Sequence, residues 1–407
     1  MKRAGYGTWG MAAAGVALLG AIAAFAWAPA AEGGEAIKIG GSVPLTGRYG
    51  GGGAQNKAGY ELAVEAINRA GGVSVGGQKL PLELTLLDDE SDPTKTVARM
   101  ETLASQGLVA YLGGFASDMH AAAAAIAEKN KIPYCGVAFS LYTIHQQGYR
   151  YLFSPFSKSP DQARATFQVV NDYVPEARRP KKVAMFLEKT DWGKELGDLW
   201  QKDAASLSYQ VVVRAEYAVG SKDFSDIILK AKGAGAESIF MLPNPPDGMG
   251  IVKQMQELDY TPKYLMAIRA PDPPVWSKNL GKAGDYVALS PGWHHAVKYP
   301  GVAELNAAHQ KRLGRPADPI VGPSYACVQV VANAIERAGS LDREKVRDAI
   351  AATNMMTVIG PVRFNPDGTG QVQTFVVQWL DGKQELVWPK EFATKPFAYP
   401  APPFKQR

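Results

Sequence analysis

The stretch of residues 108–140 constrains the fold of this chain more than any other. It opens with an apolar run at residues 108–112 and closes with a second at 132–138, each of a length typical of a buried strand. The segment between them, residues 121–129, is rich in alanine, the strongest helix former. A strand, a helix and a strand in this order predict a βαβ unit with parallel strands. The carboxyl ends of both strands then face the same edge of a sheet.

Ser117 and Ser140 are expected at that edge. In open parallel sheets, ligands bind outside the carboxyl ends of the strands, beside the free N–H groups of helix N-termini. Ser117, followed by Asp118, stands where a helix N-cap belongs. Two interpretations are open at this point: the serines line a ligand pocket, or they only cap helices.

Residues 1–30 are expected to form a secretory signal peptide rather than part of the fold. Lys2-Arg3 supplies a positive start, residues 11–27 are apolar, and small residues precede a cleavage site after Ala30. A retained membrane anchor is the alternative, because the apolar run is close to the minimum spanning length. No later segment is apolar enough to span a membrane, so we expect an exported soluble protein.

The charge of the chain argues against a nucleic-acid partner. The formal net charge is +5, and the basic residues are dispersed along the sequence. The densest basic run, at residues 178–182, is interpreted as a solvated loop before a strand.

The two cysteines are expected to be buried free thiols. Cys135 lies in a predicted strand, and Cys327 lies in a predicted helix far along the chain. One disulfide is the alternative in an exported protein.

Two further motifs have a functional and a structural interpretation. Residues 50–53 are all glycine, but they lack the spacing of phosphate-binding loops, so we expect a flexible loop that presents Tyr49 to a cleft. Residues 88–92 contain four carboxylates, which would suit a metal or catalytic site. We favour the structural interpretation, in which Asp92 caps a helix that has Pro93 at its first position.

After residue 154 the alternation of strands and helices begins again, which predicts a second parallel sheet. Two such series are too large to share one sheet, so the sequence predicts two α/β lobes. The strands of the second series are expected at 182–187, 209–216, 238–242, 264–268 and 286–290, and its helices at 161–173, 192–206, 223–232 and 247–258.

The C-terminal third is mostly helical and ends in a hairpin. Helices are predicted at 302–313, 322–338 and 342–352. Strands at 375–380 and 384–388 flank Asp381-Gly382, which is typical of a tight hairpin turn.

The sequence shows no sign of catalysis, and we expect no enzyme activity, no cofactor and no metal. The chain has no metal-binding histidine spacing, no GxSxG elbow and no Walker motif. The five histidines are His120, His145, His294, His295 and His309.

Several polar and aromatic residues directly follow predicted strands and are candidates for a ligand cleft. Hydroxyls and helix N-terminal amides suit a ligand carboxylate, a buried aspartate suits an ammonium group, and aromatic rings can enclose an apolar side chain. Together they describe an α-amino acid site, although Trp192 can instead be core and Asp247 can be a helix cap. The candidates are Tyr49, Ser117, Ala138, Ser140, Trp192 and Asp247.

Several motifs in a fixed order resemble the type I periplasmic solute-binding proteins of ABC transporters, close to the leucine/isoleucine/valine-binding proteins. The motifs include IKIGGSVPLTGRYG, AVEAINRAGG, YLGGFAS, KDFSDIILKAK and IGPVRFNPDGTG, and the resemblance spans residues 37–388. Each motif alone is weak, but their order and spacing together are specific.

The resemblance implies an α/β fold of two Rossmann-like lobes with parallel sheets, joined by a three-stranded hinge (a Venus flytrap). The first lobe would comprise residues 36–154 and 291–365, the second 155–290 and 372–390, followed by a tail at 391–407. Such a protein is periplasmic and monomeric, captures a small amino acid or related carboxylate by hinge closure, and delivers it to a membrane permease. A branched-chain or aromatic amino acid is favoured. A ligand-sensing receptor for amides, urea or aromatic acids on the same fold is the alternative.

The resemblance also implies roles for the cleft residues. Tyr49, Ser117, Ala138 and Ser140, with Phe139 between the last two, would bind the ligand from the first lobe. Trp192 and Asp247 would bind it from the second, where the family often has Tyr and Glu. Arg269 and Trp293 also follow second-lobe strands and are further candidates; an arginine there would favour a dicarboxylate or aromatic acid. The predicted ligand-binding residues are therefore Tyr49, Ser117, Ala138, Phe139, Ser140, Trp192, Asp247, Arg269 and Trp293.

Overall fold

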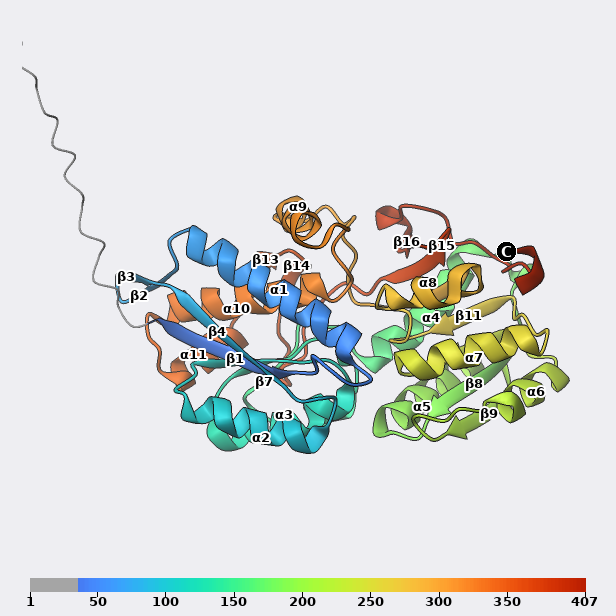
Figure 1. The fold of residues 1–407 in the computed structure, drawn as a ribbon, viewed down its shortest axis with the longest axis horizontal. Coiled ribbons are helices and arrows are strands. Elements are labelled where there is room, and N and C mark those ends of the chain that lie inside the picture. Colours follow the sequence, from blue (N-terminus) through green and yellow to red (C-terminus); the bar gives the residue numbers. More distant parts are fainter. Residues whose placement is uncertain (1–35) are drawn as a thin grey trace, which may run out of the picture. The chain divides into compact units, whose positions relative to one another are not determined.

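The computed structural model describes residues 36–407, which contain two large β-sheets flanked by helices (Figure 1). The predicted signal peptide lies outside the described residues. In the first sheet, all neighbouring strands are parallel. Its strands, in spatial order, are β4 (Leu82–Asp88), β1 (Ile37–Val43), β5 (Ala110–Leu112), β6 (Tyr134–Cys135) and β7 (Leu152–Phe153).

The second sheet is parallel over its first five strands and ends in an antiparallel hairpin. The hairpin turns at Asp381 and Gly382, which both have positive φ angles of 51° and 71°, as a type I′ turn requires. In spatial order the strands are β9 (Gln210–Tyr217), β8 (Lys182–Glu188), β10 (Ser238–Met241), β11 (Tyr264–Ala267), β12 (Val287–Leu289), β15 (Val376–Leu380) and β16 (Lys383–Trp388).

Helices cover both faces of each sheet, and we call each sheet with its helices a lobe (Figure 1). The two-lobed α/β fold that the sequence predicts is confirmed. The first lobe has α1 (Gly50–Arg69), α2 (Pro93–Ser105), α3 (Ser117–Asn130), α9 (Val302–Leu313), α10 (Val321–Ala338) and α11 (Arg343–Ala351). The second lobe has α4 (Ser159–Tyr173), α5 (Asp191–Ser206), α6 (Ser225–Gly233), α7 (Pro245–Glu257) and α8 (Val275–Leu280).

The sequence does not predict two short hairpins, because their strands have only three or four residues each. The first, at β2 and β3, turns at Gly76 and Gly77, a pair of glycines that is itself a hairpin signal. The hairpins are β2 (Val73–Val75) with β3 (Gln78–Leu80), and β13 (Asn354–Thr357) with β14 (Gly360–Arg363).

The glycines of residues 50–53 begin helix α1, so the expectation of a flexible loop is wrong. Tyr49 is the N-cap residue, and the glycines allow close packing of the first turn. A Cβ on Gly52 would lie 2.4 Å from the Phe115 ring, and one on Gly53 would lie 1.9 Å from the carbonyl oxygen of Pro44. The glycines are therefore explained by steric contact rather than by flexibility.

The acidic segment before α2 has the structural role that the sequence analysis favours. The Asp92 carboxylate accepts hydrogen bonds from the N–H groups of Thr94 and Lys95 (2.7 and 3.2 Å), with Pro93 at the first helical position. Asp88 accepts from the Leu45 N–H group at 2.9 Å. Among residues 36–407, no group of acidic, histidine or cysteine side chains is arranged to hold a metal ion.

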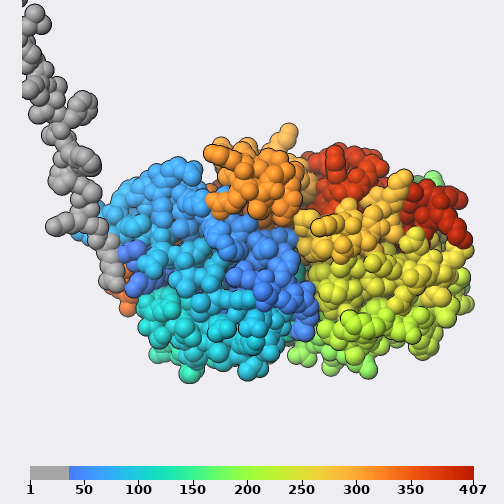
Figure 2. All heavy atoms as spheres, viewed as in Figure 1, coloured from blue at the N-terminus to red at the C-terminus, as the bar shows by residue number. Residues whose placement is uncertain are grey.

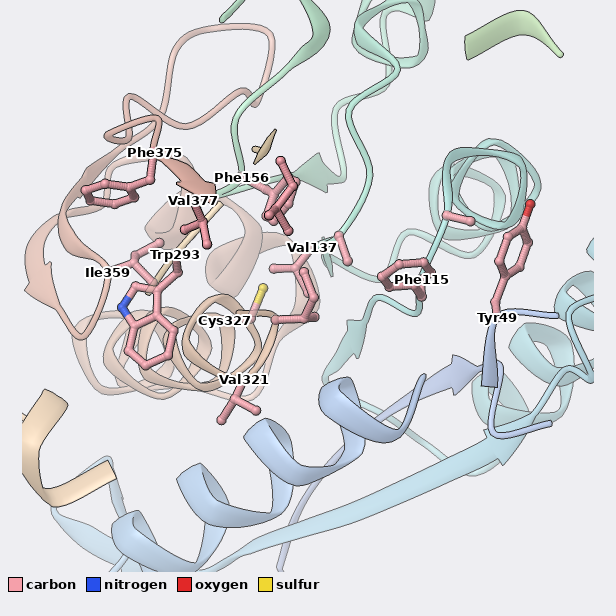
Figure 3. Close-up of a cluster of buried hydrophobic side chains, with 14 of the residues drawn as sticks. Tyr49, Phe115, Val137, Phe156, Trp293, Val321, Cys327, Ile359, Phe375 and Val377 are labelled. Carbon is pink, nitrogen blue, oxygen red and sulfur yellow. The ribbon is translucent and has the colours of Figure 1, made fainter. Parts of the chain in front are cut away.

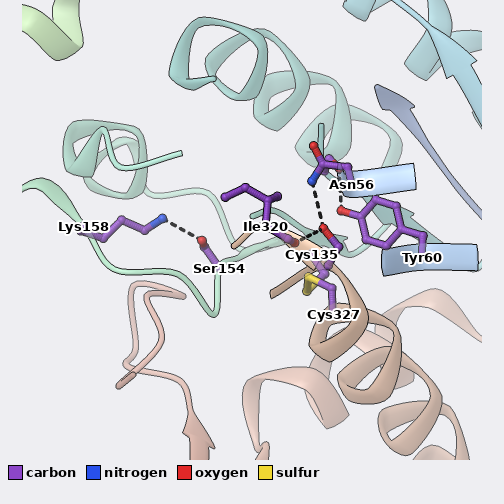
Figure 4. Close-up of a disulfide and its surroundings, with 9 residues drawn as sticks. Asn56, Tyr60, Cys135, Ser154, Lys158, Ile320 and Cys327 are labelled. Atoms are coloured by element: carbon purple, nitrogen blue, oxygen red, sulfur yellow. Dashed lines mark hydrogen bonds between the residues drawn. A yellow bond between two sulfur atoms is a disulfide. The ribbon is translucent and has the colours of Figure 1, made fainter. Parts of the chain in front are cut away.

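Cys135 and Cys327 form a disulfide, so the prediction of two free thiols is wrong (Figure 4). Cys135 ends strand β6, and Cys327 lies on the buried face of α10, among the core side chains of Figure 3. Because α10 lies across the first sheet, the two Cα atoms are 5.8 Å apart despite a sequence separation of 192 residues. Sequence separation alone gave no indication of this contact.

The segments that connect the two lobes are hydrogen-bonded to one another. The N–H group of Ser154 donates to the Gly368 carbonyl (2.9 Å), and the N–H group of Gly370 donates to the Ser154 carbonyl (2.8 Å). The Ser290 hydroxyl donates to the Phe375 carbonyl at 3.0 Å. Three connecting segments therefore run together, as the resemblance implies.

The C-terminal residues pack on the second lobe (Figure 2). The Ala401 N–H group donates to the Lys263 carbonyl at 2.9 Å, and the Arg407 guanidinium donates to the Asp285 carbonyl at 2.7 Å. Within residues 36–407, none of the helices has the length and apolar character needed to cross a membrane.

Candidate functional site

Two adjoining cavities lie between the lobes and share Ser117, Trp192 and Arg269; we call them together the cleft. Residues after β5 and β6 form one wall, and residues after β8 and β11 form the opposite wall. The first cavity is lined by Phe115, Ala116, Ser117, Ala138, Phe139, Ser140, Phe156, Gln162, Trp192, Ile268, Arg269, Asp272, Ser290 and Ile320. The second is lined by Tyr49, Ser117, Asp118, Ala121, Leu141, Thr190, Asp191, Trp192 and Arg269.

Ser117 is the first residue of helix α3, so the expectation that it is the N-cap is wrong. The N-cap is Ala116, which has a positive φ of 81° and supplies no side-chain cap. The Ser117 hydroxyl instead accepts from the N–H groups of Ser140 and Leu141, both at 3.4 Å. It thereby connects the two loops of the first-lobe wall. Ala116 provides no side-chain cap, and in the first turn the Met119 N–H group donates to the Asp118 carboxylate (3.2 Å). The positive dipole of a helix N-terminus is suited to an anionic group.

The chain after β6 is irregular because it forms the cleft wall. The sequence predicts a strand to residue 138, but β6 ends at Cys135. Ala138, three residues later, has a positive φ of 58°, so the chain turns there, and Phe139 and Ser140 line the cleft. The three residues predicted here, Ala138, Phe139 and Ser140, thus line one cavity.

Trp192 reaches the cleft from the start of α5 and is held by a hydrogen-bond chain. Its indole N–H donates to the Ser159 hydroxyl (3.2 Å), which donates in turn to the Ser140 carbonyl (2.9 Å). The chain of bonds connects the two lobes. Trp192 is only 5% exposed but lines both cavities, so it is not solely a core residue.

Arg269 lies in the loop after β11 and places a buried cation at the cleft. Its guanidinium forms an ion pair with Glu188 and donates to the Leu242 carbonyl at 2.9 Å. The guanidinium carbon is 4.8 Å from the centroid of the Trp192 ring and 5.4 Å from that of Tyr49, within the range of cation–π contacts. Burial alone lowers the pKa of Arg269, but the Glu188 carboxylate outweighs it, so the pKa is raised.

Glu188 is a buried acid that the sequence analysis overlooks. It is the last residue of β8 and is 1% exposed. Besides pairing with Arg269, its carboxylate accepts from the backbone and side-chain amides of Asn244 (2.6 and 3.2 Å). One feature of the sequence could have identified Glu188: it is an acidic residue at the end of a mostly apolar strand, KVAMFLE.

Asp247 does not line either cavity. Its carboxylate accepts from the N–H group of Gly220 (2.8 Å) and the side-chain amide of Asn244 (2.7 Å), and its own N–H donates to the Asn244 side chain (3.1 Å). These bonds stabilise the N-terminus of α7, but the N-cap residue is Asn244, so the alternative that Asp247 is itself the cap is wrong. Burial raises the pKa of Asp247, opposed by the hydrogen bond from Gly220.

Trp293 also lies away from both cavities. It is fully buried, and its indole N–H donates to the Val358 carbonyl at 2.9 Å (Figure 3). The geometry assigns it to the core of the protein.

Three titratable side chains surround the Phe139 ring behind the cleft wall. The centroids of the His120 and His145 rings lie 4.2 and 5.7 Å from that of Phe139, and the Lys158 ammonium nitrogen lies 3.5 Å from it. Lys158 donates to the Phe139 carbonyl (2.9 Å) and to the Ser154 hydroxyl (2.7 Å; Figure 4). Burial lowers the pKa of both histidines to about 3 and lowers the pKa of Lys158.

Comparison with known proteins agrees with this fold. The Leu/Ile/Val-binding protein homolog 3 of Brucella melitensis is 27% identical over 359 residues, 85% of this chain and 92% of that protein. A leucine-binding protein from Thermotoga maritima has a TM-score of 0.78 at 24% identity, covering 86% of this chain and 97% of that one. A solute-binding protein from R. palustris, solved with benzoate, has a TM-score of 0.75 at 17% identity, covering 86% and 95%. Residues 36–384 match the periplasmic binding protein family, and because this match spans most of the sequence, the chain belongs to that family.

Proposed function

We propose that the chain is the solute-binding component of an ABC importer and that it binds a small carboxylic acid with an apolar or aromatic body. The observation that carries the proposal is the cleft, where the uncapped N-terminus of α3 at Ser117 and the cation of Arg269 occupy opposite walls. The helix N-terminus favours an anionic group. Arg269 adds guanidinium N–H donors on the opposite wall, while Glu188 balances its charge.

The remaining walls of the cleft suit an apolar ligand body. Aromatic and aliphatic side chains dominate the first cavity, and aromatic faces pack well against branched or aromatic side chains. The similar proteins support this chemistry, because leucine and benzoate both combine one carboxylate with an apolar body. The larger apolar lining residues are Phe115, Phe139, Phe156, Trp192, Ile268 and Ile320.

We further propose that binding closes the lobes and that the closed form delivers the solute to a membrane permease. The lobes would comprise residues 36–154 with 291–365, and 155–290 with 372–390. Polar contacts between the lobes support closure: the Glu195 carboxylate of α5 accepts from the N–H groups of Tyr142 (2.7 Å) and Thr143 (2.8 Å). A monomer in the periplasm, with a binding rather than an enzymatic role, is part of the same proposal.

A thermal-shift screen tests the proposal. The protein is heated with a panel of aliphatic and aromatic amino acids, the matching acids without an amine, dicarboxylates and short amides. A ligand that binds only the native state raises Tm with concentration. We expect a shift with one or more monocarboxylates that have an apolar body. A shift with neutral amides alone would contradict the carboxylate assignment.

A variant tests closure independently of the cleft. Glu195 lines neither cavity, so Glu195→Ala removes a contact between the lobes without changing the ligand surface. We expect weaker binding of the same ligand, through a faster dissociation rate. Equal dissociation rates for the two proteins would contradict the closure proposal.

A further inference from the structure

We infer that Asp272 and Gln162 form a specificity site in the cleft that recognises an ammonium group of the ligand. The inference rests on the proposed function and deepens it, because it distinguishes amino acids from carboxylic acids without an amine. Neither residue is among the candidates that the sequence indicates.

Asp272 places an unused carboxylate in the first cavity. The residue is 5% exposed, and its buried Oδ1 atom has no hydrogen-bond partner within residues 36–407. Its backbone is held by other contacts: its N–H donates to the Arg269 carbonyl (3.1 Å), and its carbonyl accepts from the side chains of Gln55 (3.3 Å) and Gln384 (3.1 Å). The backbone is therefore positioned while the carboxyl group is left without a protein donor.

Gln162 supplies a second unused acceptor in the same cavity. Its Nε2 group donates to the Ser290 carbonyl at 3.2 Å, which sets the orientation of the amide. Its buried Oε1 atom then has no donor among the described residues. Gln162 comes from α4 and Asp272 from the loop after β11, so two separate elements bring acceptors to one cavity.

Residues 36–407 offer no cation that pairs with Asp272. Arg269 is the charged group that acts on it electrostatically, but the Arg269 guanidinium is paired with Glu188, and Asp272 forms no ion pair in the described part of the chain. Burial raises the pKa of Asp272 well above its ordinary value, partly opposed by Arg269. A buried polar group without a partner is unfavourable, so a ligand that supplies donors gains affinity.

An ammonium group fits these two acceptors better than other donors do. It carries three N–H donors and one positive charge, so it can serve the Asp272 carboxylate and the Gln162 carbonyl together. Because the charges of Arg269 and Glu188 cancel, Asp272 is the acid of the first cavity that remains to balance a ligand cation. The ligand carboxylate would then lie toward Ser117, at the N-terminus of α3.

Calorimetric titration with matched ligand pairs tests the inference. Leucine is compared with 4-methylpentanoate and phenylalanine with 3-phenylpropanoate, because each pair differs only in the ammonium group. We expect the amino acid of at least one pair to bind the wild-type protein ten-fold or more tightly than its partner. Asp272→Asn should weaken the binding of the amino acid at least ten-fold. It should change the affinity for the deaminated acid less than three-fold.

Two further variants serve as a control and a second probe. Asp247→Asn changes an acid outside both cavities and should leave the ratio of affinities unchanged. Gln162→Met removes the second acceptor while preserving the length of the side chain. It should reduce the ratio of the affinity for the amino acid to that for the deaminated acid, and it provides a test if Asp272→Asn does not fold.

The outcomes separate this inference from the proposed function. Equal affinities within both pairs, with no effect of Asp272→Asn, would overturn the inference and leave the carboxylate proposal standing. A loss of discrimination in Asp247→Asn instead would also overturn it. Binding of neither acid nor amino acid, with binding of neutral amides, would overturn the proposed function itself.

Discussion

Arg269 and Glu188 form an ion pair in which both side chains are almost completely buried, at 7% and 0% exposure. The pair joins the ends of strands β11 and β8, 81 residues apart in the sequence. It allows a guanidinium to lie against Trp192 at the cleft without leaving a net charge in the interior. Removing either partner would leave the other charge buried and unpaired. We therefore expect a substitution of one partner to lower the stability of the protein strongly.

Glu188→Ala is expected to lower the free energy of unfolding by about 3–5 kcal/mol, because the Arg269 charge would remain buried without its partner. Urea unfolding followed by circular dichroism measures the change. The double variant Glu188→Leu with Arg269→Met should recover most of this loss, since buried pairs are often replaceable by apolar side chains. A double variant no more stable than Glu188→Ala would contradict the explanation.

An exposed ion pair provides the matched control for that experiment. Arg214 and Asp198 are 2.7 Å apart, but their side chains are 29% and 56% exposed. Asp198→Asn should change the free energy of unfolding by at most about 0.5 kcal/mol, because water screens the pair.

The Cys135–Cys327 disulfide is expected to stabilise the protein, because it closes a long loop of the unfolded chain. The double variant Cys135→Ala with Cys327→Ala should lose about 2–4 kcal/mol of unfolding free energy. Thiol titration of the denatured wild-type protein should detect no free thiol before reduction and two after it. Two thiols before reduction would show that the cysteines are not bonded.

His120 is expected to make the protein sensitive to acid. Its folded pKa is about 3, against 6.5 in the unfolded chain, so the unfolded state binds more protons between these values. The contribution to stability is present above pH 6.5 and is lost progressively as the pH falls. At pH 5 the loss attributable to His120 is about 2 kcal/mol relative to pH 7.5.

The variant His120→Asn isolates this effect. The His120 Nδ1 atom lies 2.8 Å from the Ala116 carbonyl, and an asparagine amide can donate to the same acceptor without titrating. The decrease in unfolding free energy from pH 7.5 to pH 5 should be smaller in the variant by about 2 kcal/mol. An identical decrease in the two proteins would indicate that His120 does not titrate on unfolding.

Gly53→Ala is expected to destabilise the start of helix α1 by at least about 2 kcal/mol, because the new Cβ would overlap the Pro44 carbonyl oxygen. Gly233, at the end of α6, has no atom within 4 Å of an added Cβ and is the control. Gly233→Ala should be neutral or stabilising by up to about 1 kcal/mol. Thermal unfolding compares the three proteins, and equal Tm values would refute the steric explanation.

The elements of the fold were largely predictable, because their signals are local. Apolar runs separated by amphipathic helices indicate parallel sheets wherever they occur, and the predicted strand at 264–268 differs from β11 by one residue. The errors fall where tertiary contacts override local preference. The glycines of residues 50–53 are helical because Pro44 and Phe115 pack against them, and β6 ends early because its continuation lines the cleft.

The candidate site was predictable only in part. Tyr49, Ser117 and Trp192 follow strands, and the sheet topology brings such positions together, so their place in the cleft follows from the sequence. Asp247 follows a strand as well, but Asn244 and Gly220 bind its carboxylate at the start of α7. Position after a strand places a residue at the sheet edge without determining the direction of its side chain.

The sequence by itself determined the two α/β lobes, the family and the edge of each sheet at which the cleft lies, because periodicity and motif order are properties of the chain. The tertiary structure decided which partners meet: Cys135 with Cys327, Glu188 with Arg269, and Asp272 with Gln162 in one cavity. The physical reason is that disulfides, buried ion pairs and unpaired acceptors depend on distances of a few ångströms between segments far apart in the chain. No local pattern in a sequence records such distances.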